Sequence, residues 1–201
     1  FANPQVFTQV GTQNFTITGG QAQWVNATCG TYDKQYRNLN DTLSNNYFKA
    51  QFNFTVLPNP QGHGAGAVLL AFTSGIEDFQ CYDANGNYLS TTQDGIGVII
   101  NSSSISNNNI NMWSLLLITK EDSIRTVGTS TILLSSTITD YYMIFERESE
   151  TIVNMSLYTD SLQTTLVGQA TNTVSADILD LYVMQIGTST PGWFTREFNG
   201  T

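Results

Sequence analysis

Strict alternation of apolar and polar residues is the feature that most limits what this chain can fold into. In residues 47–57, Phe48 and Phe54 would face one way, whereas Lys49 and Asn53 would face the other. A period of two residues is typical of a half-buried β-strand, and almost no segment shows the helical period of 3.6. The sequence therefore predicts an all-β protein.

The same alternation recurs at short intervals along the chain. Residues 151–158 would point Val153, Met155 and Leu157 inward and Asn154 outward. Further predicted strands cover residues 5–10, 14–17, 23–27, 65–73, 95–100, 113–119, 131–135, 140–148, 164–173 and 179–186. The stretch 65–72 is apolar on both faces, as in a central strand that is covered on both sides. Short, regularly spaced strands of this kind predict a single β-sandwich, jelly-roll or immunoglobulin-like.

The charge balance excludes several classes of function. The chain has 7 Lys and Arg against 16 Asp and Glu, so its net charge is −9. A surface so poor in cations cannot replace the counterions of nucleic acids or bind anionic lipids. No apolar run approaches the ~18 residues of a membrane-spanning helix, so we expect no membrane insertion. A single histidine, His63, excludes mechanisms that need two imidazoles.

Seven Asn-x-Ser/Thr sequons indicate an extracellular glycoprotein. About four would occur by chance under the acceptor rule, so their placement on outward strand faces says more than their number. The predicted N-glycosylation sites are Asn14, Asn26, Asn40, Asn53, Asn101, Asn154 and Asn199. Because residue 1 is Phe, we expect a mature chain whose targeting segment has been removed. Covalent N-glycans are expected, and no other cofactor.

Cys29 and Cys81 are the two cysteines of the chain. Their spacing fits neither a metal knuckle nor a redox motif, and an even count in a secreted chain suggests one disulfide. In the chain-entropy model such a loop contributes about 4 kcal/mol. The alternative is a pair of buried thiols.

Alternating carboxylates occur in residues 146–150, where Glu146, Glu148 and Glu150 would share one face of an extended segment. Retaining glycosidases place two carboxylates about 5 Å apart around the scissile bond, so the pattern is compatible with a glucanase. The alternative is a hairpin turn at Ser149 and Glu150. We favour the hairpin because no tryptophan-lined segment accompanies the acids, and we predict no catalytic residue.

A possible calcium loop lies further upstream. Asp83, Asn85, Asn87 and Asp94 offer oxygen ligands at a suitable spacing. However, Asn85 followed by Gly86 is also the strongest tight-turn dipeptide. We favour the turn and predict no metal site.

His63 and the three tryptophans could each belong to a functional site or have a purely structural role. His63 lies in a glycine-rich turn with no Ser or Cys motif beside it, so we expect an exposed loop residue rather than a base. Trp24, Trp113 and Trp193 could stack on sugars, but large aromatics are mostly buried, and we expect at least two of them in the core.

Residues 141–187, together with residues 47–72, resemble concanavalin-like and laminin-G-like sandwich domains. The shared features are a Tyr-rich strand, a hairpin, a second strand ending near Asp160, and a Leu-rich strand that closes in Gly187. The resemblance implies a sandwich of two sheets. Such domains include lectins, enzymes and adhesion modules, so the fold does not determine the function.

The two ends of the chain depart from that family. There a segment like residues 198–201 leads into a last strand that closes the sheet, whereas residues 1–10 are an extended segment without an evident turn partner. We therefore expect residues 12–201 to form an incomplete sandwich, and residues 1–11 to form a donor strand and hinge. A strand from a neighbouring subunit would complete the open sheet.

An acidic, sequon-rich β-domain with these ends resembles the subunit of the archaeal thread surface filament. Subunits of that family are glycosylated and linked head to tail by donor-strand complementation. The resemblance implies a donor strand around Val6, Phe7, Thr8 and Val10, identical subunits as partners, and a location in an extracellular filament used for attachment or cell contact. The alternative is a monomeric carbohydrate-binding module of the laminin-G or concanavalin type, whose partners would be surface glycans.

Overall fold

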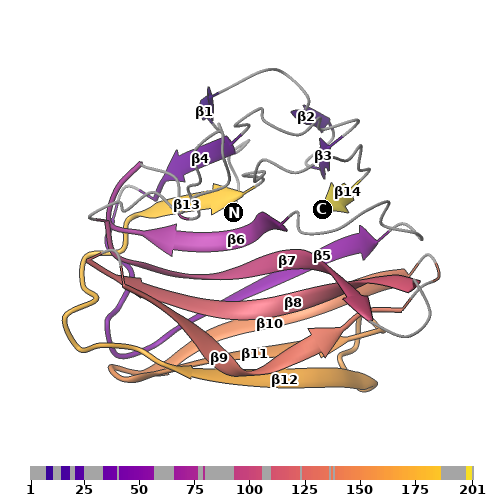
Figure 1. Ribbon diagram of the computed structural model, residues 1–201. Coiled ribbons are helices and arrows are strands. Elements are labelled where there is room, and N and C mark those ends of the chain that lie inside the picture. Colours follow the sequence, from indigo (N-terminus) through magenta and orange to yellow (C-terminus); the bar gives the residue numbers. More distant parts are fainter. Residues whose placement is uncertain are drawn as a thin grey trace.

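The structure is a computed structural model that describes residues 8–10, 15–18, 21–24, 34–39, 41–56, 66–76, 79, 93–105, 110–122, 124–135, 137, 139–186 and 198–200. Every regular element in these ranges is a β-strand, and the strands form two seven-stranded sheets in two layers (Figure 1). The predicted all-β sandwich is confirmed.

All neighbouring strands within each sheet are antiparallel. Sheet 1 contains, in spatial order, β1 (Thr8–Val10), β4 (Lys34–Asn38), β13 (Val183–Ile186), β6 (Gly66–Thr73), β7 (Gly95–Ile105), β8 (Ile110–Glu121) and β9 (Ile124–Leu133). Sheet 2 contains β12 (Leu166–Thr173), β11 (Ile152–Tyr158), β10 (Thr139–Ser149), β5 (Phe48–Val56), β14 (Phe198–Gly200), β3 (Gln21–Trp24) and β2 (Phe15–Thr18).

The strands with the clearest alternation form the middle of sheet 2. In β11 the inward residues Val153, Met155 and Leu157 are fully buried, as the sequence predicts, while Asn154 is partly exposed on the other face. The same holds in β5, where Phe54 is buried. One face of sheet 2 therefore belongs to the core, and the other is polar.

The main core lies between the sheets, and β6 at the centre of sheet 1 is covered on both sides. From β6, Leu70 and Phe72 enter the main core, whereas Val68 and Ala71 belong to a second cluster. This confirms the central, doubly covered strand expected for residues 65–72. Trp113 of β8 is 5% exposed and belongs to the main core, as expected of a large aromatic.

The second cluster is centred on Phe79, which packs against two glycines of β7. A Cβ atom added to Gly95 would lie 2.8 Å from the Phe79 ring, and one added to Gly97 would lie 2.9 Å from it. The Phe79 backbone N–H donates to the buried amide of Gln185, at 3.1 Å. A side chain on either glycine would displace Phe79 from this position.

Arg147 holds the hairpin between β10 and β11 from the inside. Its side chain is fully buried, and its guanidinium donates to the backbone carbonyls of Ser149, Glu150 and Ile178. Burial lowers the pKa of Arg147, and the charge of Glu150 opposes that shift. Arg147 thus joins the hairpin to the segment before β13.

Thr8–Val10, the described part of the predicted donor strand, pair with their own chain. These residues form β1, which pairs with β4 of the same chain in the register Thr8 to Tyr36 and Val10 to Lys34. Backbone groups at the edge of a sheet need partners, and β4 supplies them within the chain. Val6 and Phe7 lie outside the described residues.

The expectation of an unclosed sheet at the C-terminal segment is wrong. Phe198–Gly200 forms β14, which lies between β5 and β3 and pairs with both. The ladder places Asn199 opposite Thr55 on one side and Gln23 on the other. β14 therefore joins β5 to β3 within the same chain.

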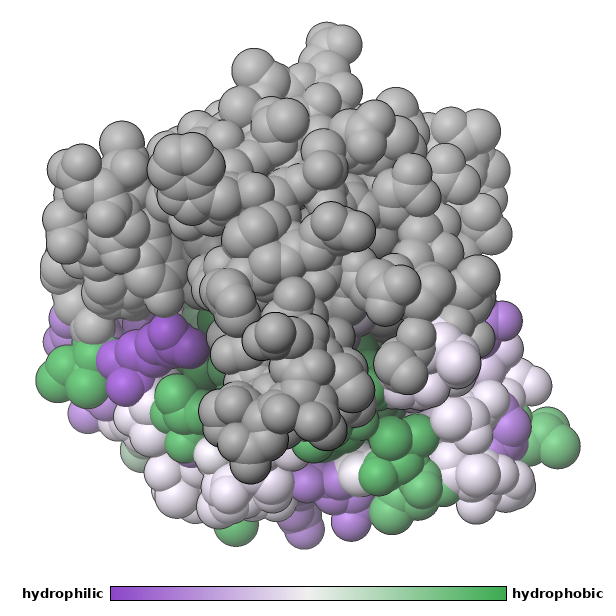
Figure 2. Space-filling view, turned by 45° about the vertical axis from the view of Figure 1, so that its right-hand side comes forward, coloured by the Kyte–Doolittle hydropathy of each residue, from purple (hydrophilic) through white to green (hydrophobic). Residues whose placement is uncertain are grey.

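Exposed apolar side chains do not form one large patch on the visible described surface. Figure 2 shows hydrophobic residues in separate small groups among hydrophilic and intermediate ones. The most exposed large apolar residues are Leu162 (83%) and Ile124 (72%). Scattered residues of this kind are ordinary on a soluble protein surface.

Candidate functional site

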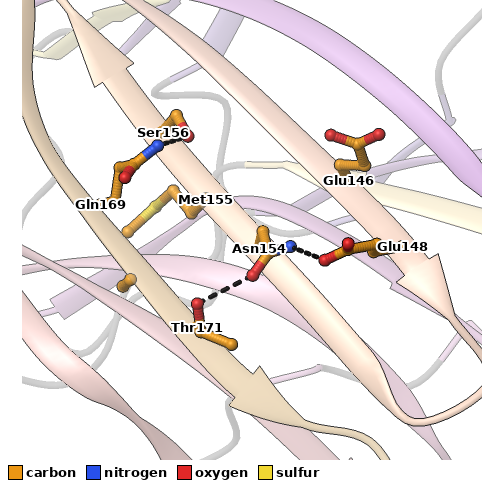
Figure 3. A pocket seen from close by; sticks show the side chains of 8 residues that line it. Glu146, Glu148, Asn154, Met155, Ser156, Gln169 and Thr171 are labelled. Atoms are coloured by element: carbon orange, nitrogen blue, oxygen red, sulfur yellow. Dashed lines mark hydrogen bonds between the residues drawn. The ribbon is translucent and has the colours of Figure 1, made fainter.

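A polar hollow lies on the outer face of β10, β11 and β12, on the side of sheet 2 that faces away from the core. It encloses about 340 Å³. Its lining residues are Glu146, Glu148, Asn154, Met155, Ser156, Gln169, Ala170 and Thr171 (Figure 3). Met155 and Ala170 belong to the buried face, so the polar side chains of the other six residues give the hollow its chemistry.

The register of the three strands brings these side chains together. Asn154 is paired with Glu146 on one side and Thr171 on the other. Two residues further along β11, and on the same face, Ser156 pairs with Gln169. Residues directly opposite each other in an antiparallel sheet have neighbouring side chains on the same face. The alternation that buries the core residues of β11 therefore sets Asn154 and Ser156 in a polar row across three strands.

Hydrogen bonds fix the orientation of the amide groups in the hollow. Asn154 Nδ2 donates to Glu148 Oε2 at 2.6 Å, and the Thr171 hydroxyl donates to Asn154 Oδ1 at 2.8 Å (Figure 3). Gln169 Nε2 donates to Ser156 Oγ at 3.0 Å. Both ends of the Asn154 amide are engaged, so its donor and acceptor directions are set.

An aromatic residue outside the lining interacts with Glu146, which lines the hollow. Tyr47, just before β5, is 53% exposed. A side-chain hydrogen bond with Glu146 raises the pKa of Tyr47, with smaller contributions from burial and from the Glu146 charge. The hydrogen bond holds the phenol beside the carboxylate, with much of the ring open to solvent.

The structure brings together two of the three acids that the sequence predicted on one face. Glu146 and Glu148 both line the hollow, whereas Glu150 is exposed in the hairpin turn and does not line it. The predicted hairpin is present, with Ser149 as the last residue of β10 and its turn one residue later than expected, at Glu150 and Thr151. Sequence reasoning missed Ser156, Gln169 and Thr171 as members of a site, although the predicted strand over residues 164–173 contained the last two.

The predicted sequons fall in different parts of the structure. Asn53 is exposed on the outer face of β5, and Asn154 lies in the hollow. Asn101 lies in β7 and Asn199 in β14. Asn14, Asn26 and Asn40 lie outside the described residues.

Several other predicted residues also lie outside the described ranges. These are Cys29, Cys81, His63, Asp83, Asn85, Asn87 and Trp193. Trp24 lies in β3. Asp94 is described: its Oδ1 accepts from the Asp122 N–H at 3.0 Å, and its own N–H donates to Ser74 Oγ.

The described residues contain neither a metal-binding cluster nor a membrane-spanning helix. No cluster of three or more His, Cys, Asp or Glu within these ranges could hold a metal ion. Among the same residues there is no helix of the length and apolar character that crossing a membrane requires.

Comparison with known proteins identifies the fold. No family model matches the sequence, and no curated protein matches it. The potassium-bound carbohydrate recognition domain of Emp46p superimposes with a TM-score of 0.56 and 9% identity, over 96% of this chain and 84% of that one. A legume lectin-like domain from Entamoeba histolytica superimposes with a TM-score of 0.54 and 12% identity, over 96% of this chain and 86% of that one. A protein of unknown function from Shewanella oneidensis MR-1 superimposes with a TM-score of 0.54 and 15% identity, over 96% of this chain and 77% of that one. The fold is thus that of the legume-lectin and concanavalin-like β-sandwiches.

Proposed function

We propose that this chain is a carbohydrate-binding module of the lectin type that binds sugar in the hollow on β10, β11 and β12. The observation that carries the proposal is the set of oriented amide, hydroxyl and carboxylate groups in that hollow. Sugars present many hydroxyls, each both donor and acceptor, and they need partners of both kinds at fixed positions. Groups already held by neighbouring strands lose little conformational freedom on binding.

The hollow retains capacity for a ligand beyond its internal hydrogen bonds. The Ser156 hydroxyl accepts from Gln169 and can still donate. Gln169 Oε1 and the carboxylate oxygens of Glu146 and Glu148 can accept. The exposed ring of Tyr47 offers an apolar surface beside Glu146, against which the C–H face of a sugar ring can pack.

The fold comparisons favour the same function. Two of the similar structures are named as a carbohydrate recognition domain and a legume lectin-like domain. Sequence identities of 9% and 12% indicate a shared fold but say nothing about a shared binding site. The proposal therefore depends on the hollow itself. We propose a secreted, N-glycosylated and non-catalytic module. The pairing of β1 and β14 within the chain offers no support for the alternative of a filament subunit.

Paired substitutions in β12 test the proposal. Thr171→Val removes the hydroxyl that orients Asn154, and we expect it to weaken sugar binding about fivefold, the effect of one hydrogen bond. Thr173→Val is the matched control, because Thr173 is exposed on the same face but does not line the hollow. A glycan array identifies a bound sugar, and calorimetry then compares the variants. Equal sugar affinities of the two variants would mean that sugar binds outside the hollow. A glycan array on which no sugar binds would contradict the proposal as a whole.

A further inference from the structure

The charges of the hollow limit the kind of sugar that can enter it. Glu146 and Glu148 are both among the lining residues, and none of the lining residues is Lys or Arg. Arg147 lies between them in sequence, but its side chain points into the core and donates to three backbone carbonyls. The strand alternation therefore sends both carboxylates to the ligand side and the intervening cation to the other side.

The nearest cation in the ladder of sheet 2 lies away from the centre of the hollow. Glu146 of β10 has two cross-strand partners: Lys49 of β5 on one side and Asn154 of β11 on the other. Lys49 is not among the residues that line the hollow. The whole chain, with a net charge of −9, adds to the negative potential.

The hydrogen-bonding groups left in the hollow are mainly acceptors. Tyr47 and Asn154 each donate to one of the two carboxylates, which leaves further lone pairs on both. Gln169 adds its amide oxygen as an acceptor; one of the two protons on its Nε2 is donated to Ser156 and the other stays available. A ligand that fits must supply donors, such as the neighbouring hydroxyls of a neutral sugar or an ammonium group.

We propose that the hollow selects non-acidic sugars, with Glu146 and Glu148 accepting hydrogen bonds from the ligand and repelling sialic acids and uronates. This inference rests on the proposed carbohydrate binding and adds the class of sugar. A ligand carboxylate about 6 Å from each glutamate, in a medium close to water, would lose about tenfold in affinity. An amino sugar with a free ammonium group would gain by a similar factor at low salt.

Matched pairs of sugars test the selectivity. The probes are neutral oligosaccharides that the wild-type chain binds on an array, each beside the same oligosaccharide carrying a terminal sialic acid or uronate. We expect the acidic member of each pair to bind about tenfold more weakly. In the double variant Glu146→Gln and Glu148→Gln the difference should fall to about threefold or less, because both amides still accept hydrogen bonds but carry no charge. Thermal unfolding of each variant checks that the sandwich is intact.

Glu150→Gln is the control, because Glu150 is exposed in the hairpin turn but does not line the hollow. It should leave the difference between neutral and acidic sugars unchanged. Acidic sugars that bind wild type as well as their neutral parents would overturn the inference and leave carbohydrate binding intact. A difference that persists in the double variant would also overturn it, because the exclusion would then arise elsewhere. Binding of no sugar at all would overturn both proposals.

Discussion

At the scale of single residues, Asp160 shows how one carboxylate organises the turn between β11 and β12. Its two oxygens accept from the backbone N–H of Thr164, at 3.1 Å each, and one accepts from the N–H of Thr165 at 2.6 Å. The Thr164 hydroxyl donates to the same carboxylate. These hydrogen bonds, first among them that from the Thr164 N–H, lower the pKa of Asp160, and slight burial opposes them. The turn sets the start of β12, which carries Gln169 and Thr171.

The lowered pKa of Asp160 predicts a pH-dependent stability. A carboxyl whose pKa is lower in the folded state stabilises the fold above its unfolded pKa, and the contribution disappears as the pH falls through the folded value. We expect Asp160→Asn to reduce the melting temperature at pH 6 and to have progressively less effect below about pH 4. Asp177→Asn, in another exposed turn, is the control. A melting difference for Asp160→Asn that is the same at pH 2 and pH 6 would contradict the assignment.

Asn154 is a residue with two incompatible uses. It belongs to a sequon, yet its Nδ2 is the atom that donates to Glu148 within the hollow. An N-linked sugar is attached to that nitrogen and would fill the space that a ligand needs. We expect glycoforms of the chain that are occupied at Asn154 not to bind sugar, whereas glycoforms occupied at Asn53 should bind normally. Separation of glycoforms followed by calorimetry measures this, and equal binding by the two would exclude the hollow as the binding site.

At the scale of elements, the close approach of β6 and β7 requires glycine at residue 97. An added Cβ would lie 2.7 Å from both the Leu70 carbonyl oxygen and the Ala71 Cβ. The carbonyl belongs to the neighbouring strand and cannot move without breaking the ladder. We expect Gly97→Ala to reduce the free energy of unfolding by about 1–3 kcal/mol in urea titrations. Gly75→Ala, whose Cβ would make ordinary contact at 3.4 Å, should have little effect. Similar losses for both variants would contradict the packing described.

The elements predicted from sequence were those with a clear alternation or a long apolar run. β5, β6, β10 and β11 belong to this group. β4 was missed because its sequence, KQYRN, has almost no apolar residue to show a period. β14 has only three residues, and its pairing depends on β5 and β3, which are far away in the chain. Local sequence contains no information of that kind.

The site was predictable only in part for the same reason. Alternation alone placed Glu146 and Glu148 on one face. The meeting of Asn154 with Thr171 and of Ser156 with Gln169 depends on the register between β11 and β12. This register follows from the turn closed by Asp160, which the sequence marks only as a polar stretch.

At the scale of the whole molecule, the two sheets are joined along one edge by side chains. β9 and β12, the last strands of their sheets, lie together at the bottom of Figure 1. The Thr129 hydroxyl donates to the Thr171 carbonyl at 3.1 Å and accepts from its N–H at 3.4 Å. Asn172 Nδ2 donates to the Thr126 carbonyl at 3.0 Å. These bonds satisfy backbone groups at an edge that could otherwise pair with another chain, and they hold β12 beneath the hollow.

The central claim is that sugar binds on the outer face of β10, β11 and β12. Nuclear magnetic resonance mapping of a sugar titration tests it most directly, because each backbone amide reports on its own surroundings. We expect the largest shifts at Glu146, Glu148, Asn154, Ser156, Gln169 and Thr171, and smaller ones at Tyr47. The core residues of the same strands should shift less. Shifts concentrated on another part of the chain, with those six residues unchanged, would contradict sugar binding in the hollow.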